Sequence, residues 1–270
     1  MSQPVTAFLR QSLALKAAIA DCLKGTSPKP VHKLRTSTRR IEATLELLAA
    51  ISTDAPADRK AKPLRKTLRK LRRAAGAVRD LDVHRELLKA YGKNADTKRF
   101  DEKLAAARDK AARKLSQTLE ENQKKVRRSL EALEVALKPA LEIDLSGGEL
   151  IHITRGWFAK NACALDPEHD DQLHSIRKAG KTARYIAETG AETSKAAAAL
   201  AARFERAQQT LGVWHDYLLL LEEAQATLSK QSPTTEQIHE KADSLRGQAL
   251  AAAQQLLITI CAVPSQAGVH

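Results

Sequence analysis

Seven short segments rich in Gly, Pro, Ser and Asp divide the 270-residue chain into eight stretches with helical periodicity. The breaks fall at residues 25–30, 52–57, 91–96, 138–148, 165–167, 189–192 and 230–233. The helical stretches span residues 5–24, 29–51, 58–91, 97–137, 148–163, 167–189, 193–229 and 233–260. Aromatic residues make up only 3% of the chain and alanine is abundant, which favours closely packed helices over sheets. We therefore predict an all-α fold.

The eight stretches divide into four plus four around residues 138–148, and the order of their lengths is similar in the two halves. Such self-similarity is typical of an internal repeat. We predict two tandem four-helix bundles, residues 1–143 and residues 144–270, that together form one domain. The stretch 97–137 is dense in charged residues with leucines at helical spacing, so we expect a long, largely exposed amphipathic helix there.

The charge balance points to an anionic partner. The chain has 45 Lys and Arg against 32 Asp and Glu, which gives a formal net charge of +13. A protein this basic attracts polyanions at physiological pH. Nucleic acid, an anionic membrane surface, polyphosphate and acidic proteins all remain open, as does a solvated basic surface that binds nothing.

The cysteines and the chain start indicate a reducing, aqueous environment. Cys22, Cys163 and Cys261 are odd in number and far apart, so neither a disulfide framework nor a close-spaced zinc motif is predicted. We expect three buried thiols. The first residues lack the pattern of a signal peptide, and no stretch approaches the roughly 18 apolar residues that span a membrane. We therefore expect a soluble, cytoplasmic protein without a membrane partner.

A basic stripe occurs twice in the sequence. The segment VHKLRTSTRRI, residues 31–41, matches LHSIRKAGKTA, residues 173–183, at an offset of 142. At about 100° per residue, His32, Arg35 and Arg39 share one helix face, opposite apolar residues. The stripe of the second copy comprises His174, Arg177, Lys181, Arg184 and Tyr185. A single helical His is more often a surface or core residue than a ligand group, but its repetition with the same cationic neighbours favours function.

The third stretch adds more cations to the predicted site. Between Arg59 and Arg79 there are ten Lys and Arg and no acidic residue. Its polar face carries Arg65, Arg69, Arg72, Arg73 and Arg79.

A second internal match pairs AAGAVRDLDV, residues 74–83, with TLGVWHDYLL, residues 210–219. Gly76 and Gly212 occupy equivalent places in it, where glycine admits a close approach of another backbone or a phosphate chain, or serves helix packing. Asp80 and Asp216 are equivalent too, and we expect these carboxylates to support the site by orienting neighbouring Arg and His side chains.

Catalysis and metal binding are less favoured than binding alone. An aspartate that activates water on a bound phosphate usually works with a divalent metal held by several oxygen ligands, which the basic stripes do not offer. A zinc site made by His32, His174, His215 and Asp216 is conceivable, but the surrounding arginines oppose a cation. We therefore predict no catalytic residue, no metal and no cofactor.

At these residues the sequence resembles the CHAD family, the conserved histidine α-helical domain. The resemblance rests on HKLRTSTRRI and GAVRDLDV in the first half and on HSIRKAGKTARY and LGVWHD in the second. It implies two four-helix bundles related by a pseudo-twofold axis, with a basic central channel that binds inorganic polyphosphate. It also implies an association with polyphosphate granules.

The resemblance carries over residue by residue onto this chain. The matched positions are His32, Arg35, Arg39, Arg40, Arg72, Arg73, Arg79, His174, Arg177, Lys181, Arg184, Tyr185 and His215. The predicted polyphosphate-binding set also includes Arg65, Arg69 and Lys178. The second half departs at Thr182, where the first has Arg40, and at Gln208 and Gln209, opposite Arg72 and Arg73. We therefore expect it to hold phosphate less strongly.

The sequence thus predicts a non-catalytic protein that binds inorganic polyphosphate. The alternatives are a helical nucleic-acid-binding protein and a metal-dependent polyphosphate or nucleotide phosphohydrolase. Neither stripe has several aromatics for stacking bases and no reading motif is present, so nucleic acid is expected only as a competing polyanion. Binding should weaken with salt and strengthen as the pH falls through the titration range of histidine. Whether the basic halves form one channel or two grooves is left open.

Overall fold

A computed structural model of the chain describes residues 1–51, 55–229 and 231–262. For residues 55–58 it describes the backbone only. These residues form helices and no β-strand, so the predicted all-α class is confirmed. The elements are α1 Pro4–Lys24, α2 Pro28–Ile51, α3 Ala55–Leu88, η1 Lys89–Tyr91, α4 Ala95–Ala136, η2 Lys138–Ala140, α5 Gly147–Ala162, α6 Asp170–Glu188, α7 Lys195–Gln225 and α8 Pro233–Cys261. Residues 52–54 and 230, inside two of the predicted breaks, lie outside the described residues.

Helix starts follow local capping chemistry. The side chain of Asn94 accepts a hydrogen bond from the Thr97 amide at the start of α4, and Ser146 does the same for Glu149 at the start of α5. α6 begins three residues later than predicted, at Asp170. The reason is a turn in which Asp166 accepts a hydrogen bond from the Glu168 amide, so these residues do not enter the helix.

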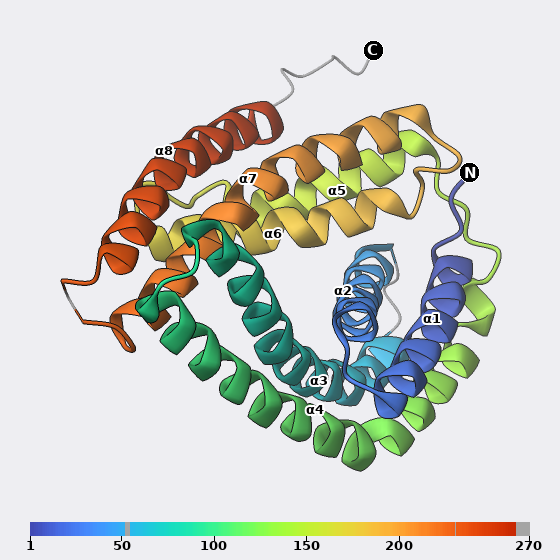
Figure 1. Cartoon of the computed structure of the whole chain (residues 1–270). Coiled ribbons are helices and arrows are strands. Elements are labelled where there is room, and N and C mark those ends of the chain that lie inside the picture. The colour runs from blue at the N-terminus through green and yellow to red at the C-terminus, as the bar shows by residue number, and fades with distance from the viewer. Residues whose placement is uncertain (52–54, 230, 263–270) are drawn as a thin grey trace.

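Each half of the chain packs around its own core (Figure 1). Helices α1 to α4 bury a cluster that includes Phe8, Leu34 and Leu68. Helices α5 to α8 bury a second one around Phe158 and Phe204, and this cluster extends to residues of α3 and α4, Leu81, Leu88, Phe100 and Leu104. The long helix α4 therefore serves both cores. The division at residue 143 and the pseudo-twofold relation remain predictions.

A third cluster joins the two halves. It contains Ala43 and Leu47 of α2, Leu150 of α5, Ile186 of α6 and Ala197 of α7, with Leu145 from the connecting segment. Next to it, Ser2 and Leu145 exchange backbone hydrogen bonds of 2.7 and 2.8 Å. α2 thus lies between α3 on one side and α6 on the other, as Figure 1 shows.

The expectation of three free thiols is wrong for two of the cysteines. Cys163, at the end of α5, forms a disulfide with Cys261, the last residue of α8, across a Cα–Cα distance of 5.8 Å. Their separation of 98 residues hid the pairing, because only the packing of α5 with α8 brings these helix ends together. Cys22 is a free, buried thiol as expected, and burial raises its pKa to about 11.

Among the described helices, none is both long and apolar enough to cross a membrane.

The disulfide closes a long loop and should stabilise the second half. Cys261→Ser, or reduction of the wild type, should lower the free energy of unfolding by about 2–5 kcal/mol, because the open chain regains loop entropy on unfolding. Urea unfolding with and without dithiothreitol measures this effect. Reductant should not change the stability of Cys261→Ser itself. An identical urea midpoint for oxidised and reduced wild type would contradict the prediction.

Candidate anion-binding site

The two predicted basic stripes face each other across the contact of α2 with α6. Arg35 and Arg39 of α2 lie near Arg177 and Lys181 of α6, close enough for the charges of one half to lower the pKa values of the other. We call the group that meets here the central cluster. Its members are His32, Arg35, Arg39, Arg72, Arg79, His174, Arg177, Lys178, Lys181 and His215. The structure therefore brings both halves to one site.

Arg35 is fixed by α3. Its Nη1 atom donates to Asp80 Oδ1 at 2.7 Å and to the carbonyl of Gly76 at 3.4 Å. A Cβ atom on Gly76 would lie 3.3 Å from the same Nη1 atom. The glycine thus leaves room for a guanidinium, rather than for another helix backbone. Asp80 therefore contacts a stripe arginine, and its supporting role in a ligand site stays a prediction.

The second copy repeats this pattern loosely. Arg177 is 5% exposed, and its Nη2 atom lies 4.0 Å from Asp216 Oδ1. Its buried Nε atom has no hydrogen-bond partner among the described residues. A Cβ atom on Gly212 would meet nothing within 4 Å, so this glycine makes room for no neighbour, unlike Gly76.

Crowding of like charges disfavours the charged state of these side chains. Burial and the neighbouring Arg177, Arg39 and Arg35 lower the pKa of Lys181 to about 6. Burial, followed by Arg35 and Arg72, lowers the pKa of Arg39 to about 10. Desolvation and repulsion act in the same direction on a buried cation, and a nearby anion would reverse the second effect.

Two histidine rings, one from α6 and one from α7, lie in contact in the cluster, tilted by 41° to one another. The rings of His174 and His215 have centroids 4.3 Å apart. Burial and then adjacent cations, Lys178 for His174 and Arg177 for His215, lower their pKa values to about 4 and about 3. Both buried Nδ1 atoms lack a hydrogen-bond partner in the described structure. The rings are therefore neutral at pH 7.

His32 lies at the more exposed edge of the cluster, near the start of α2. Burial and the charges of Arg79, Arg35 and Lys181 lower its pKa. Because the charge of Lys181 affects His32, these two residues of different halves also lie near each other. The exposed Lys178 lies beside His174.

Acidic partners that the sequence reading missed hold two arginines of α3. Arg72 is paired with Glu42 and Arg65 with Glu46, and Glu46 also accepts a hydrogen bond from the Trp157 indole at 3.1 Å. Glu42 and Glu46 follow Arg39 by three and seven residues, so they continue the polar face of α2. This spacing is the signal that could have revealed them. Arg65 is thereby tied to an acid instead of facing the cluster.

Other predicted residues lie apart from the cluster. Arg40 and Arg184 both pair with Glu188, at 2.9 and 2.6 Å, and both guanidiniums lie over the Tyr185 ring. This network borders a pocket of about 430 Å³ between α1, α2 and α6. Arg69 and Arg73 are exposed on α3.

Two further expectations concern the second half and metals. Gln208, which replaces a cation of the first half, donates to the carbonyl of Gly180 at 2.9 Å, so it holds α7 to α6. Burial and then Asp80 raise the pKa of Asp216, while Arg177 opposes the shift. In the described part of the chain, no three His, Cys, Asp or Glu side chains come together as a set that could hold a metal ion.

Comparison with known proteins assigns the family. The family model of the CHAD domain matches residues 6–225. The chain belongs to the CHAD family. The crystal structure of the CHAD domain from the plant Ricinus communis is similar, with a TM-score of 0.67 at 20% sequence identity, and the match covers 97% of this chain and 91% of that one. PptA from Streptomyces chartreusis is also similar, with a TM-score of 0.63 at 18% identity over 96% of this chain and 100% of that one. At these identities the likeness concerns the fold. No curated protein matches the sequence significantly.

The two glycines provide a matched test of the space beside Arg35. Gly212→Ala should raise the free energy of unfolding by about 0.5–1 kcal/mol, because alanine favours the helix and meets nothing. Gly76→Ala should raise the free energy of unfolding by less than this, or lower it, because the added Cβ presses on the Arg35 guanidinium. Urea unfolding of both variants measures the difference. Equal stabilisation by the two substitutions would show that Gly76 has no special role.

Proposed function

We propose that the chain binds inorganic polyphosphate at the central cluster and leaves it chemically unchanged. The observation that carries this proposal is the convergence of buried and half-buried cations from both halves, whose pKa values are lowered by burial and by one another. Such an arrangement is unfavourable without an anion. A polyanion in contact with it would relieve the repulsion.

The spacing of the cations suits a chain of phosphates. Side chains three and four residues apart on a helix lie about 5–6 Å apart, so successive cations of α2 and α6 can meet successive phosphoryl groups. Arg offers paired donors to the nonbridging oxygens, and neutral His donates from one nitrogen. Because Arg35 and Arg177 come from different halves, one ligand chain should contact both.

Binding without catalysis is favoured by the state of the carboxylates. Asp80 accepts a hydrogen bond from Arg35, and Asp216 lies against Arg177 and Lys181. The hydrogen bond from Arg35 occupies one oxygen of Asp80 and weakens that carboxylate as a base for activating water. The rival phosphohydrolase would release phosphate from polyphosphate with magnesium or manganese, and the release would stop in Asp80→Asn or Asp216→Asn.

Nucleic acid is the second rival. We propose that it competes poorly, because most cations of the cluster are half-buried between α2 and α6, whereas a duplex backbone needs an open basic face. Displacement of long-chain polyphosphate by duplex DNA at equal phosphate concentration would reverse this preference. In a cell we propose that the protein associates with polyphosphate granules. A fluorescent fusion whose signal does not follow granules would refute that placement.

The cross-half pair of arginines should dominate binding. Arg35→Ala combined with Arg177→Ala should weaken polyphosphate binding by about 10- to 100-fold, since two charge-assisted contacts are lost. Arg127→Ala with Arg128→Ala, on the exposed face of α4, removes the same charge as a control and should have a small effect. Titration calorimetry measures both.

For the wild type, the affinity should fall at least about tenfold between roughly 50 and 200 mM salt. Binding indifferent to salt, or equal losses in the two double variants, would contradict the proposed site.

Binding should take up a proton through Lys181. In the free protein the pKa of Lys181 is lowered to about 6, so above that pH the amine is mostly neutral. A bound polyanion raises this pKa, so the complex holds more protons than the free protein and affinity falls as the pH rises above about 6. Calorimetry at pH 7.5 in buffers of different ionisation enthalpy measures the uptake.

Lys181→Gln should reduce this uptake. Proton uptake of zero in the wild type, or uptake unchanged in Lys181→Gln, would refute the assignment. This window lies above the lowered pKa values of His174 and His215, so it differs from the histidine range expected from the sequence.

A further inference from the structure

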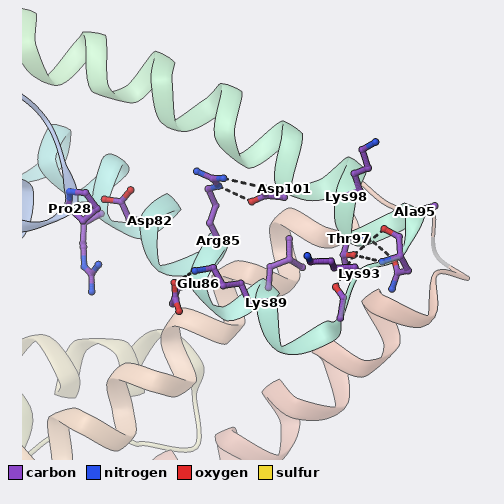
Figure 2. Close-up of a pocket in the computed structure, with 14 residues that line it drawn as sticks. Pro28, Asp82, Arg85, Glu86, Lys89, Lys93, Ala95, Thr97, Lys98 and Asp101 are labelled. Carbon is purple, nitrogen blue, oxygen red and sulfur yellow. Dashed lines mark hydrogen bonds and ion pairs between the residues drawn. The ribbon is translucent and has the colours of Figure 1, made fainter.

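A large pocket meets the central cluster only at Arg79. It has a volume of about 1030 Å³ and occupies the turn from α3 to α4, beside the start of α2 (Figure 2). Pro28 and Asp82 lie at one end of the view, and Lys93 and Ala95 at the other. A cavity of this size accommodates an organic ligand rather than a single ion.

The walls of this pocket combine apolar surface with cations. Pro28, Leu88 and Ala95 supply apolar surface, to which the stems of the lysines add. Lys93 and Lys98 are exposed and, within the described structure, form no ion pair. Arg79 also lines the pocket without an acidic partner in that same part of the chain.

Three carboxylates in the wall are already neutralised by the protein. Asp82 pairs with Arg108 at 3.0 Å, Glu86 with Lys89 at 2.6 Å and Asp101 with both nitrogens of Arg85 at 2.7 and 3.1 Å. The Arg85–Asp101 and Glu86–Lys89 pairs are drawn in Figure 2. These acids therefore oppose an anion little, and the unpaired charges left in the pocket are positive.

Arg79 connects this pocket with the central cluster. It lines the pocket beside Pro28, and it is also the cation that most affects the titration of His32. A phosphate group at Arg79 would thus lie at the edge of the cluster, with apolar surface behind it.

We propose that this pocket is a second ligand site, which takes an organic polyphosphate: a short phosphate chain attached to an aromatic ring system, as in a nucleoside triphosphate. The ring lies against Leu88 and Ala95, and the phosphates extend along α3 to Arg79. Inorganic polyphosphate gains nothing from the apolar wall, so the two ligand classes differ in what they use. The site does not depend on the function proposed for the central cluster.

The test compares two ligands that share a triphosphate chain. ATP should bind the wild type at least about tenfold more tightly than inorganic tripolyphosphate in magnesium-free buffer, measured by calorimetry. Ala95→Trp places an indole where the ring of ATP would lie and does not change the charge, so it should abolish the preference for ATP and leave tripolyphosphate binding unchanged. Ala132→Trp, on the exposed face of α4, is the matched control and should retain the preference.

Location is tested without a variant. Photolabelling with 8-azido-ATP should place the label on peptides from residues 79–101, and a label found only elsewhere would overturn the proposal. Equal affinity of the wild type for ATP and tripolyphosphate, or a preference that survives in Ala95→Trp, would overturn it too. Binding of long-chain polyphosphate by Ala95→Trp separates the two sites. Retained polyphosphate binding with a lost preference for ATP supports both proposals. If the central cluster proves not to bind polyphosphate, the ATP result still tests the pocket.

Discussion

The contact between α2 and α6 is the constraint on which the site depends. Apolar residues of this interface, among them Leu47, Leu150 and Ile186, are fully or almost fully buried where the halves meet. Burying each such side chain contributes about 1.5–3 kcal/mol. That gain holds together two helices whose polar faces carry Arg35, Arg39, Arg177 and Lys181, and which would otherwise repel. The fold thus holds these cations close together, although their mutual repulsion would separate them on an exposed surface.

Acidic residues shape this charge by their positions. Glu42 and Glu46 neutralise Arg72 and Arg65 towards one end of α2, and Glu188 bridges Arg40 and Arg184 at the side facing α1. Inside the cluster, Asp80 lies beside Arg35 and Asp216 beside Arg177. These two carboxylates are outnumbered by the cations around them. The pairs made by Glu42, Glu46 and Glu188 offset part of the charge around the cluster, while the cluster itself holds more cations than acids. A polyanion would be attracted to the centre, where low solvent exposure strengthens each interaction.

The sequence was sufficient for the helices because their starts and ends are encoded locally, by caps such as Asn94 and Ser146. It also identified the repeated stripes, since periodicity and offset need no tertiary information. It was insufficient for the Cys163–Cys261 disulfide and for the pairs Arg72–Glu42 and Arg65–Glu46. Those contacts depend on how one helix is placed against another. For the same reason the stripe positions could not separate Arg35, which faces the other half, from Arg73, which faces solvent.

The central claim is that the two stripes make one site and not two. The most direct measurement is the stoichiometry of a short, monodisperse inorganic polyphosphate on the intact chain, by native mass spectrometry with calorimetry. One bound chain is predicted, and either Arg35→Ala or Arg177→Ala alone should weaken that one binding event. Two bound chains of which each substitution removes one, with the other unaffected, would contradict the account.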